Sequence, residues 1–595
     1  MADYAAPLAD IDFQLRAVGG LDHVLSLPPF GGIDAETVRH ILEEGGRFAG
    51  EALAPLNRGG DMTPAKLENG QVRTSPGFAD AYRQFSAGGW NSVPFDAEYG
   101  GQGLPWLVQT ALGEMWNAAN LSFALCPLLT NGAIEALSTH GSDEQKRIYL
   151  PKMIAGEWTG TMNLTEPQAG SDLGQVRTRA VPAGDHYKIT GQKIFITYGE
   201  HDLTPNIVHL VLARMPDAPA GTRGISLFVV PKFLVKPDGS LGQRNDLRCA
   251  SLEHKLGIHG SPTCVMAYGD DGGAIGYLVG EANRGLEYMF TMMNNARLAV
   301  GLQGVAIAER AYQQALAFSR QRVQSRDVAG SSGPVPIIRH PDVRRMLMTM
   351  KAGTEATRGL ALQAAAWIDR ARHAPEADDR ARTQALLDLI IPVVKAWATD
   401  FGVEAASIGI QVHGGMGFIE ESGAAQHYRD ARILPIYEGT NGIQANDLVG
   451  RKVARDQGAA VAIFLQLVQD TIDELDLFTD EDFTAMRGAL ADGHAALTQA
   501  TEWICRTFPE DPRRAIAGAV PYLKLFGLVA GGWVMVRNAT AAEAHLGLGE
   551  GDKKFLHAKK TTARFYAEHL LVQAPSLVWP ATQPATTLAL AEDQF

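Results

Sequence analysis

Cysteine is scarce in this sequence. Its four cysteines, Cys126, Cys249, Cys264 and Cys505, lie far apart and form neither a CxxC pair nor a Cys/His group with metal-ligand spacing. Disulfide scaffolds and structural zinc sites depend on such spacings. We therefore expect reduced thiols, no metal and a cytoplasmic protein.

Basic runs and uninterrupted apolar spans are also lacking. The formal net charge is −13 and no long run of Lys or Arg occurs, which argues against a nucleic-acid partner. The first 15 residues lack the basic and apolar regions of a secretory signal. The most apolar late segment, residues 518–536, is interrupted by Pro521, Lys524 and Gly531-Gly532, and it falls short of a span of about 20 apolar residues. We expect no integral membrane segment and a buried helix there.

Length and pattern predict the architecture. A chain of 595 residues is too long for one core, and 46% hydrophobic with 20% charged residues is typical of globular proteins. Apolar residues at helical spacing come first, and short β-type runs separated by Gly and Pro turns follow. Apolar residues at helical spacing then return, and they predict enough helices for a four-helix bundle and a further helical domain. The sequence predicts a mainly α fold with a central β barrel or sandwich, in domains 1–158, 159–282, 283–452 and 453–595.

Two motifs lie in the predicted β domain. Residues 163–172, NLTEPQAGSD, form a Pro-containing turn whose hydroxyls and amides could reach a flat polar ligand, although a structural loop explains them equally well. Residues 193–197, KIFIT, alternate as a strand and would place Lys193, Phe195 and Thr197 on one face. A ring and a hydroxyl two residues apart suit a ligand that needs a stacking wall and a hydrogen bond, while core packing of Phe195 is the favoured alternative.

Two further motifs lie in the second helical region. Residues 411–418, QVHGGMGF, hold three glycines within four residues, so backbone amides could meet phosphate or sugar. Because this motif follows a helix and not a strand, it is not a GxGxxG dinucleotide site, and a helix-breaking joint is the favoured alternative. Residues 433–450, ILPIYEGTNGIQANDLVG, place Glu438 in a turn where a helical pattern breaks. An arbitrary glutamate in such a turn is usually a surface residue, so its assignment depends on the other motifs.

Together and in this order, TEPQAGSD, KIFIT, QVHGGMGF and YEGTNGIQ resemble the acyl-CoA dehydrogenase family over residues 35–452. The helical extension is similar to that of the long subgroup of this family. The resemblance implies FAD as cofactor and an acyl-CoA thioester as substrate, dehydrogenated to the trans-2-enoyl-CoA. It also implies that Glu438 takes the α-proton, that flavin N5 accepts the β-hydride, and that electrons pass to an electron-transfer flavoprotein.

The resemblance further implies the binding residues. Those expected at FAD are Asn163, Thr165, Ser171, Phe195, Thr197 and Thr440, with Arg322, Gln411, Gly414 and Gly415 reaching the FAD of a neighbouring subunit. Those expected at the substrate are Ser171, Asn294, Arg297 and Arg451. A shared site needs at least a dimer, and we expect a homodimer because the extension would cover the surface that pairs two dimers in shorter members.

Several positions depart from the family pattern. Val323-Gln324-Ser325 follow Arg322 where Lys-Thr-Phe is frequent, Asn294 replaces a common Asp, and Arg451 stands one place late. Ala296 lies where a minority of members carry another base, so Glu438 has no rival there.

Two alternative functions stay open. An acyl-CoA oxidase also has a long helical tail but lets oxygen reach the reduced flavin. A non-enzymatic flavoprotein relative associated with DNA protection needs a basic face on its extra domain, whereas acidic residues such as Asp480-Glu481-Asp482 offset the basic pairs here. Short thioether-bearing, medium and long acyl chains all remain possible, with medium to long slightly favoured, and the electron acceptor stays open.

Overall fold

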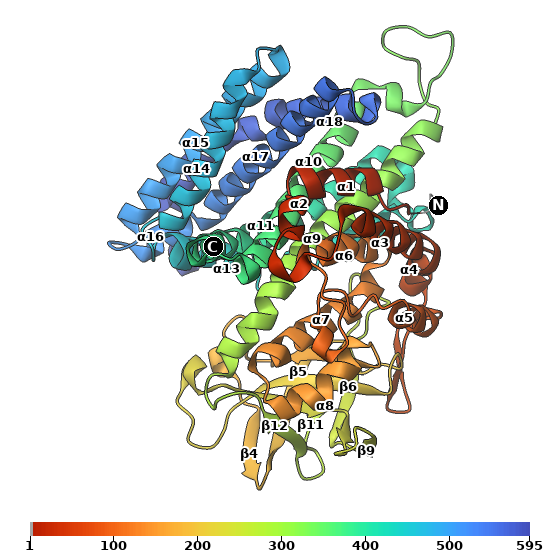
Figure 1. The fold of residues 1–595 in the computed structure, drawn as a ribbon, viewed down its shortest axis with the longest axis vertical. Helices are drawn as coiled ribbons and strands as arrows, with labels where there is room; N and C mark the ends of the chain where they lie inside the picture. Colours follow the sequence, from red (N-terminus) through yellow and green to blue (C-terminus); the bar gives the residue numbers. More distant parts are fainter. Residues whose placement is uncertain (1–3) are drawn as a thin grey trace. The chain divides into compact units, whose positions relative to one another are not determined.

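The computed structural model describes residues 4–595 and divides into two compact units. Unit 1 comprises Met1–Gly46, Pro105–Ala118 and Val300–Phe595, and unit 2 comprises Arg47–Leu104 and Ala119–Ala299. Figure 1 labels many of the helices and strands of both units. The boundaries of the four domains predicted from the sequence stay a prediction, and the predicted fold class, mainly helical with a central sheet, is confirmed.

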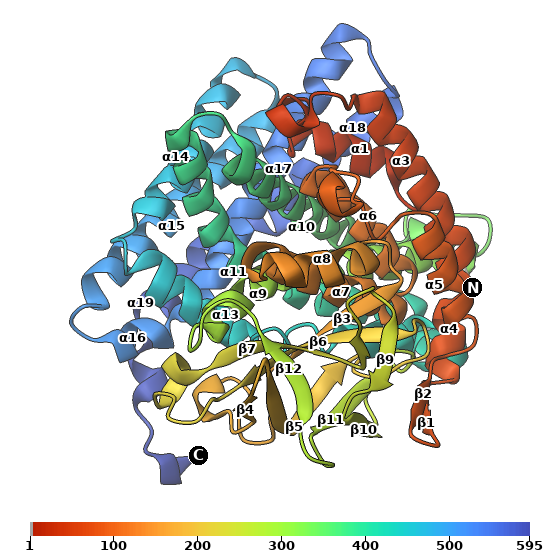
Figure 2. The same cartoon turned by 60° about the horizontal axis from the view of Figure 1, so that its bottom comes forward.

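Unit 2 is built on an eight-stranded sheet with the order β10-β11-β5-β12-β7-β6-β3, in which β4 also pairs with β5. Its strands are β3 (Trp158–Asn163), β4 (Arg179–Ala183), β5 (His186–Thr197), β6 (Asn206–Ala213), β7 (Ser226–Pro231), β10 (Leu247–Leu252), β11 (Thr263–Tyr268) and β12 (Ala274–Leu278). Only β3 and β6 pair in parallel. Strands β6 and β7 are buried along their whole length, which explains their continuous apolar sequence. The strands curl around this core (Figure 2).

Helices cover part of this sheet, and two small hairpins complete unit 2. The helices are η2 (Ala49–Leu53), α4 (Ala54–Met62), α5 (Phe78–Ala87), η3 (Ala97–Tyr99), α7 (Leu121–His140), α8 (Asp143–Ile154), η4 (Leu173–Gln175), η5 (Gly221–Gly224) and the first part of α9 (Gly285–Gln321); the hairpins are β1 (Lys66–Glu68) with β2 (Gln71–Arg73) and β8 (Phe233–Val235) with β9 (Leu241–Arg244). Helix α7 lies close on β3, since a Cβ added at Gly160 would stand 2.5 Å from the Ala133 Cβ.

Unit 1 is helical. Its N-terminal and bundle helices are α1 (Leu8–Ala17), α2 (Leu21–Leu25), η1 (Pro28–Phe30), α3 (Ala35–Phe48), α6 (Trp106–Ala119), the rest of α9, η6 (Ile337–Arg339), α10 (Pro341–His373), α11 (Ala377–His413), η7 (Gly414–Phe418), η8 (Glu420–Ser422), α12 (Ala424–Ala431), α13 (Asn441–Asp447) and η9 (Leu448–Val453). The extension contains α14 (Ala459–Glu474), η10 (Leu475–Leu477), α15 (Glu481–Thr507), α16 (Pro512–Ala517), α17 (Ala519–Leu548), α18 (Lys553–His569), η11 (Leu571–Leu577), α19 (Val578–Thr582), η12 (Pro584–Leu588) and η13 (Glu592–Gln594).

The extension packs directly on the bundle. The Trp533 ring of α17 stacks on Trp367 of α10, with 6.4 Å between ring centroids. Lys559 of α18, only 1% exposed, forms ion pairs with Glu355 of α10 (3.1 Å) and with Asp10 of α1. Apolar and ionic contacts therefore join the extension to the bundle within one core.

Within residues 4–595, two helices, α7 and α17, are long and apolar enough to cross a membrane. In both, 83% of the apolar window is buried within the protein, which is typical of core helices. The buried helix expected over residues 518–536 lies in α17 and its N-cap Gly518.

Candidate active site

Glu438 lies in a strained turn between α12 and α13. Its φ is +57°, in the left-handed region, and Gly439 follows at +82°. A non-glycine residue held in such a conformation costs roughly 1–3 kcal/mol, and such strain clusters at functional sites. The glutamate is half-buried. The backbone therefore fixes the direction of this carboxylate.

Side chains of neighbouring helices hold this turn. The Gln444 Nε2 donates to the Glu438 carbonyl oxygen at 3.1 Å. The Lys395 Nζ, on a fully buried side chain of α11, donates to the Gly439 carbonyl and to Asn441 Oδ1, both at 2.8 Å. Thr440 caps α13 by accepting a hydrogen bond from the Ile443 N–H. These bonds stabilise the left-handed backbone at Glu438.

Tyr437 anchors the turn from the other side. Its hydroxyl donates to Gln303 Oε1, and the Gln303 Nε2 donates to Asn117 Oδ1 at 3.1 Å, which links α9 and α6 of unit 1. Burial raises the pKa of Tyr437 well above its usual value, and the adjacent Glu438 charge raises it further. The phenol therefore stays protonated and acts as a donor.

Phe195, in unit 2, lies in a β-bulge. The pairs Lys193↔Met266 and Ile196↔Cys264 leave two residues of β5 opposite one of β11. Phe195 has a φ of +59° and is 59% exposed, while Lys193 is fully buried. The prediction that Lys193, Phe195 and Thr197 share one face is therefore wrong, because the extra residue breaks the alternation. Core packing of Phe195 is also excluded, because its side chain is exposed.

A buried ion pair fixes the loop that precedes this bulge. The Lys193 Nζ lies 2.8 Å from Glu166 Oε1 and also donates to the Leu164 carbonyl at 3.0 Å. The Thr178 hydroxyl and amide donate to the same carboxylate oxygen. Burial acts to raise the pKa of Glu166, but the Lys193 charge and these hydrogen bonds outweigh it and lower this pKa to about 2. The ion pair between Lys193 and Glu166 is not predicted from the sequence.

Replacing Glu166 with glutamine should lower stability. The variant leaves the fully buried Lys193, whose pKa burial already lowers to about 8, without its carboxylate. Breaking a buried ion pair in this way typically costs about 3–5 kcal/mol. Because the folded pKa of Glu166 is depressed, its contribution is full above the unfolded value of about 4.3 and is lost as pH falls towards 2. Urea unfolding at pH 7 should therefore show a large difference from wild type, and at pH 3 a smaller one. An equal difference at both pH values would contradict this account.

The remaining predicted residues of unit 2 lie in different surroundings. Thr165 and Thr197 are half-exposed, and Ser171 is exposed. The Asn163 side chain is fully buried and accepts a hydrogen bond from the Tyr268 hydroxyl at 2.7 Å, so it faces the core. Arg297 is buried near Phe290, and the side chain of Asn294 lies outside the described residues.

In unit 1, the end of α9, just before Arg322, packs against the end of α11, just before the glycines of the QVHGGMGF motif. His413 of α11 stacks on Phe318 of α9 with 4.4 Å between ring centroids. Arg322, Gln411, Gly414 and Gly415 are all exposed. Exposed apolar residues adjoin them in the sequence, namely Val323, Met416, Phe418 and Ile419. Arg451 is exposed in η9 and pairs with Asp447.

Among residues 4–595, no group of three or more His, Cys, Asp or Glu is arranged to hold a metal ion. The polar side chains at the Glu438 turn of unit 1 are amides, a hydroxyl and a buried lysine, and those of the loop before Phe195 in unit 2 are hydroxyls and a buried ion pair. Such a donor set suits an organic ligand.

Four family models match the chain: acyl-CoA dehydrogenase N-terminal domain (36–157), middle domain (161–270) and C-terminal domain (283–453), and acetyl-CoA dehydrogenase C-terminal like (464–591). The chain belongs to the acyl-CoA dehydrogenase family. It is an oxidoreductase of this flavoprotein family, which confirms the family, enzyme class and FAD predicted from the sequence.

Individual relatives match nearly the whole chain. It is 54% identical to the 3-methylmercaptopropionyl-CoA dehydrogenase of Ruegeria pomeroyi, with 96% of each chain covered. It is 35% identical to the broad-specificity linear acyl-CoA dehydrogenase FadE5 of Mycobacterium tuberculosis, again with 96% of each chain covered. Among solved structures, a Bacillus anthracis acyl-CoA dehydrogenase complexed with FAD has a TM-score of 0.74 at 20% identity, covering 96% of this chain and 91% of that one. That likeness concerns the fold alone.

Proposed function

We propose that the protein dehydrogenates a short acyl-CoA thioester between its α and β carbons, with Glu438 as the base. The observation that carries this proposal is the strained turn at Glu438, held by Lys395 and Gln444. An α-proton next to a thioester is a far weaker acid than a carboxylic acid, so a fixed carboxylate and stabilisation of the developing enolate oxygen are both needed. The backbone N–H of Glu438 is one donor for that oxygen.

The residues of unit 2 fit a flavin. Phe195 offers an exposed aromatic ring on a strained strand, and Thr165 and Thr197 offer half-exposed hydroxyls. The Ile194 N–H donates to the Thr165 carbonyl at 2.9 Å, so loop and strand form one surface. Ser171 is a further contact. FAD, when bound, supplies the acceptor for the hydride that leaves the β carbon. Asn163 contributes only its backbone, because its side chain faces the core.

The remaining predicted residues have separate roles. Thr440 fixes the start of α13 beside the base. We place Arg297 and Arg451 at the CoA moiety, together with Asn294. Arg322, Gln411 and the Gly414-Gly415 turn would reach the FAD of a second subunit in a cytoplasmic homodimer. Their common exposure beside an apolar patch supports this assignment.

The substrate is proposed from the 54% identical relative, named for 3-methylmercaptopropionyl-CoA. Because of this similarity, we propose a short thioether-bearing acyl chain in place of the medium to long chains that the sequence slightly favours. The test is an anaerobic titration of the yellow protein with 3-methylmercaptopropionyl-, butyryl-, octanoyl- and palmitoyl-CoA. Bleaching of the visible flavin band by the first two at the lowest concentrations supports the proposal. Bleaching by palmitoyl-CoA alone would overturn the substrate class, and bleaching by none would overturn dehydrogenation.

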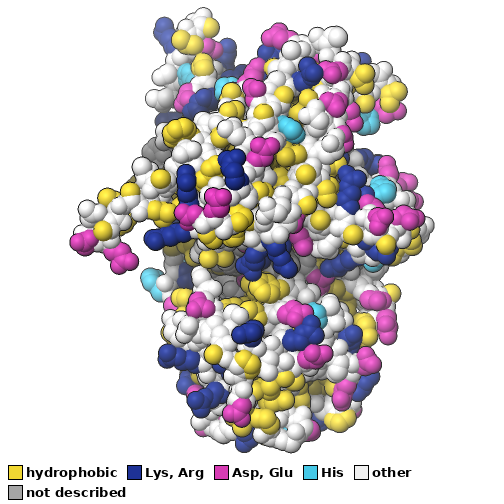
Figure 3. All heavy atoms as spheres, turned by 90° about the vertical axis from the view of Figure 1, so that its left-hand side faces the viewer, with side chains coloured by type: hydrophobic (Ala, Val, Ile, Leu, Met, Phe, Trp, Pro, Cys, Tyr) yellow, Lys and Arg dark blue, Asp and Glu magenta, His cyan; other side chains and the backbone are white. Residues whose placement is uncertain are grey.

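We propose an electron-transfer flavoprotein as the acceptor. The competing reading as an oxidase predicts oxygen consumption during turnover without added acceptor, and its absence would exclude that reading. A DNA-protecting relative needs a basic face, but Arg564 of α18 pairs with Glu481, Asp482 and Glu568. The face in Figure 3 mixes charges of both signs.

Substituting Lys395 should alter catalysis through Glu438. Lys395→Met removes both hydrogen bonds to the turn, and misplacement of a base by about 1 Å can lower turnover by about 10²-fold. Loss of the nearby positive charge should also raise the pKa of the base. The increase in the rate of flavin reduction with pH should therefore occur at a higher pH than in wild type. Lys395→Arg should restore part of the rate, and the exposed Lys554→Met serves as control. Lower stability with an unchanged pH profile would assign Lys395 a purely structural role.

The homodimer can be tested at Phe418, which is 86% exposed. Phe418→Asp places a charge in the apolar patch, and desolvating it on association should weaken the dimer by about tenfold or more. Light scattering of the wild type should give a dimer, and the variant should dissociate and lose FAD on dilution. Phe595→Asp is a matched exposed control. A wild-type tetramer would contradict the proposed role of the extension.

A further inference from the structure

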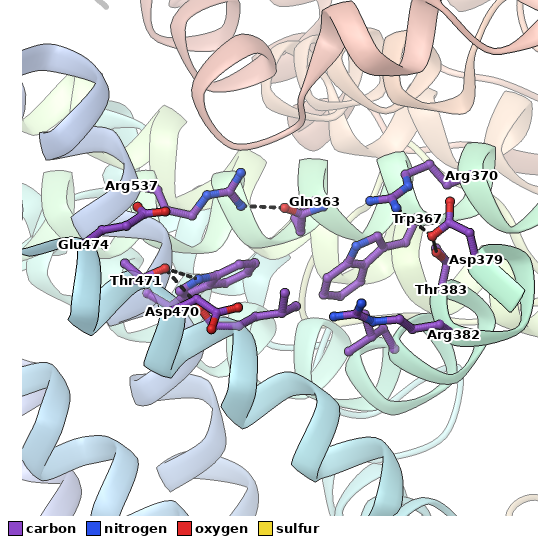
Figure 4. Close-up of a pocket in the computed structure, with 13 residues that line it drawn as sticks. Gln363, Trp367, Arg370, Asp379, Arg382, Thr383, Asp470, Thr471, Glu474 and Arg537 are labelled. Carbon is purple, nitrogen blue, oxygen red and sulfur yellow. Dashed lines mark hydrogen bonds and ion pairs between the residues drawn. The ribbon is translucent and has the colours of Figure 1, made fainter. Parts of the chain in front are cut away.

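A hollow of about 400 Å³ lies inside unit 1, between helices α10 and α11 of the bundle and α14 and α17 of the extension (Figure 4). Its apolar lining consists of Trp367, Leu386, Leu467 and Trp533. None of its residues belongs to the candidate active site. A volume of this size is typical of a pocket for a small molecule.

The rim of this pocket has two charged sides. Helix α14 places Asp470 and Glu474 on one side, and Arg370 and Arg382 lie across the gap from them (Figure 4). The Arg370 guanidinium is already paired with Asp379 at 2.7 Å. Arg382 has no hydrogen bond or ion pair with any residue in the described part of the chain. It is therefore available to an anionic group.

Asp470 is the matching group on the opposite side. Its carboxylate accepts a hydrogen bond from the Gln466 amide at 2.7 Å, and within residues 4–595 no cationic side chain lies within 4 Å of it. Glu474 is the carboxylate whose charge acts on Arg537. Arg537 forms part of the wall, since its guanidinium lies 4.8 Å from the Trp533 ring centroid and donates to Gln363 Oε1 at 2.6 Å. Within the described residues, Arg382 on one side forms no ion pair, and neither do Asp470 and Glu474 on the other.

We propose that this pocket binds a small zwitterion of the α-amino acid class. The carboxylate binds Arg382, the ammonium group binds Asp470, and the apolar side chain lies on Trp367 and Trp533. A simple anion would face the carboxylates of α14, and a simple cation would face the arginines, so only a ligand with both charges satisfies both sides. Aromatic walls favour amino acids with large apolar side chains.

Tryptophan fluorescence provides the first test, since two of the nine tryptophans line the pocket. The full-length protein is titrated with L-phenylalanine, L-leucine and glycine. Matched probes lack one charge: phenethylamine has no carboxylate, and N-acetyl-L-phenylalanine has no ammonium group. Phenylalanine and leucine should give saturable changes, and each single-charge analogue should bind at least about tenfold more weakly, because one charged hydrogen bond is lost.

Two variants and a control complete the test. Arg382→Gln and Asp470→Asn are exposed changes that should not disturb folding, and each should weaken phenylalanine binding by about tenfold or more. Arg513→Gln removes an exposed arginine outside the pocket and should leave binding unchanged. No saturable change with any amino acid, equal binding of the single-charge analogues, or unchanged binding by both variants would each overturn the proposal. None of these results depends on dehydrogenase activity.

Discussion

Glu438→Gln should lower the rate of flavin reduction by acyl-CoA by about 10³–10⁴-fold, while the protein stays folded and yellow. Glutamine keeps the shape of the side chain and leaves the Gln444 bond to the Glu438 carbonyl intact. Only the proton acceptor is lost, so binding of acyl-CoA should change far less than the rate.

The measurement is anaerobic stopped-flow bleaching of the flavin band with saturating acyl-CoA. Glu421→Gln, an exposed glutamate of η8, is the matched control and should react like wild type. If Glu438→Gln bleached at a rate close to wild type, the base would have to be sought elsewhere. If the variant lost its yellow colour on purification, the turn would be required for FAD binding and the rate would not report on the base.

Arg358→Ala should produce the largest loss of stability, about 3–5 kcal/mol. Arg358 is 1% exposed, and its Nε and Nη2 donate to the Glu114 carboxylate at 2.6–2.9 Å. The same Nη2 donates to Glu309 Oε2 at 2.7 Å. Removing the guanidinium leaves two buried carboxylates close together without a counter-charge. Burial already raises the pKa of Glu114 despite the adjacent arginine.

Thermal and urea unfolding followed by circular dichroism would measure this loss. The deficit should be largest at neutral pH and should shrink in mild acid, because protonated carboxyls tolerate burial and charged ones do not. Arg487→Ala breaks an exposed pair with Asp476 and should cost less than about 1 kcal/mol. Equal effects of the two substitutions would show that burial of the Arg358 network contributes little.

The sequence predicts the order of helical and β segments because the spacing of apolar residues and the positions of turn residues depend directly on local structure. It fails at Phe195, since a bulge with left-handed backbone leaves no mark in a strand that reads as regular alternation. It also misses Lys395, although a lone lysine inside the apolar run IIPVVKAWA is a usable signal. A charge in such a run must find partners across the fold, and those partners, Gly439 and Asn441, lie far away in sequence.

The ion pairs of Lys559 bear on how this enzyme could be shortened. A gene ending after residue 453 would leave Glu355 without Lys559 and Trp367 without Trp533. The truncated product would leave Glu355 with Lys351 as its remaining cation and would expose the aromatic face at Trp367, so we expect it to be less stable than the full chain. A stable shorter chain would therefore need a different surface where the extension now packs.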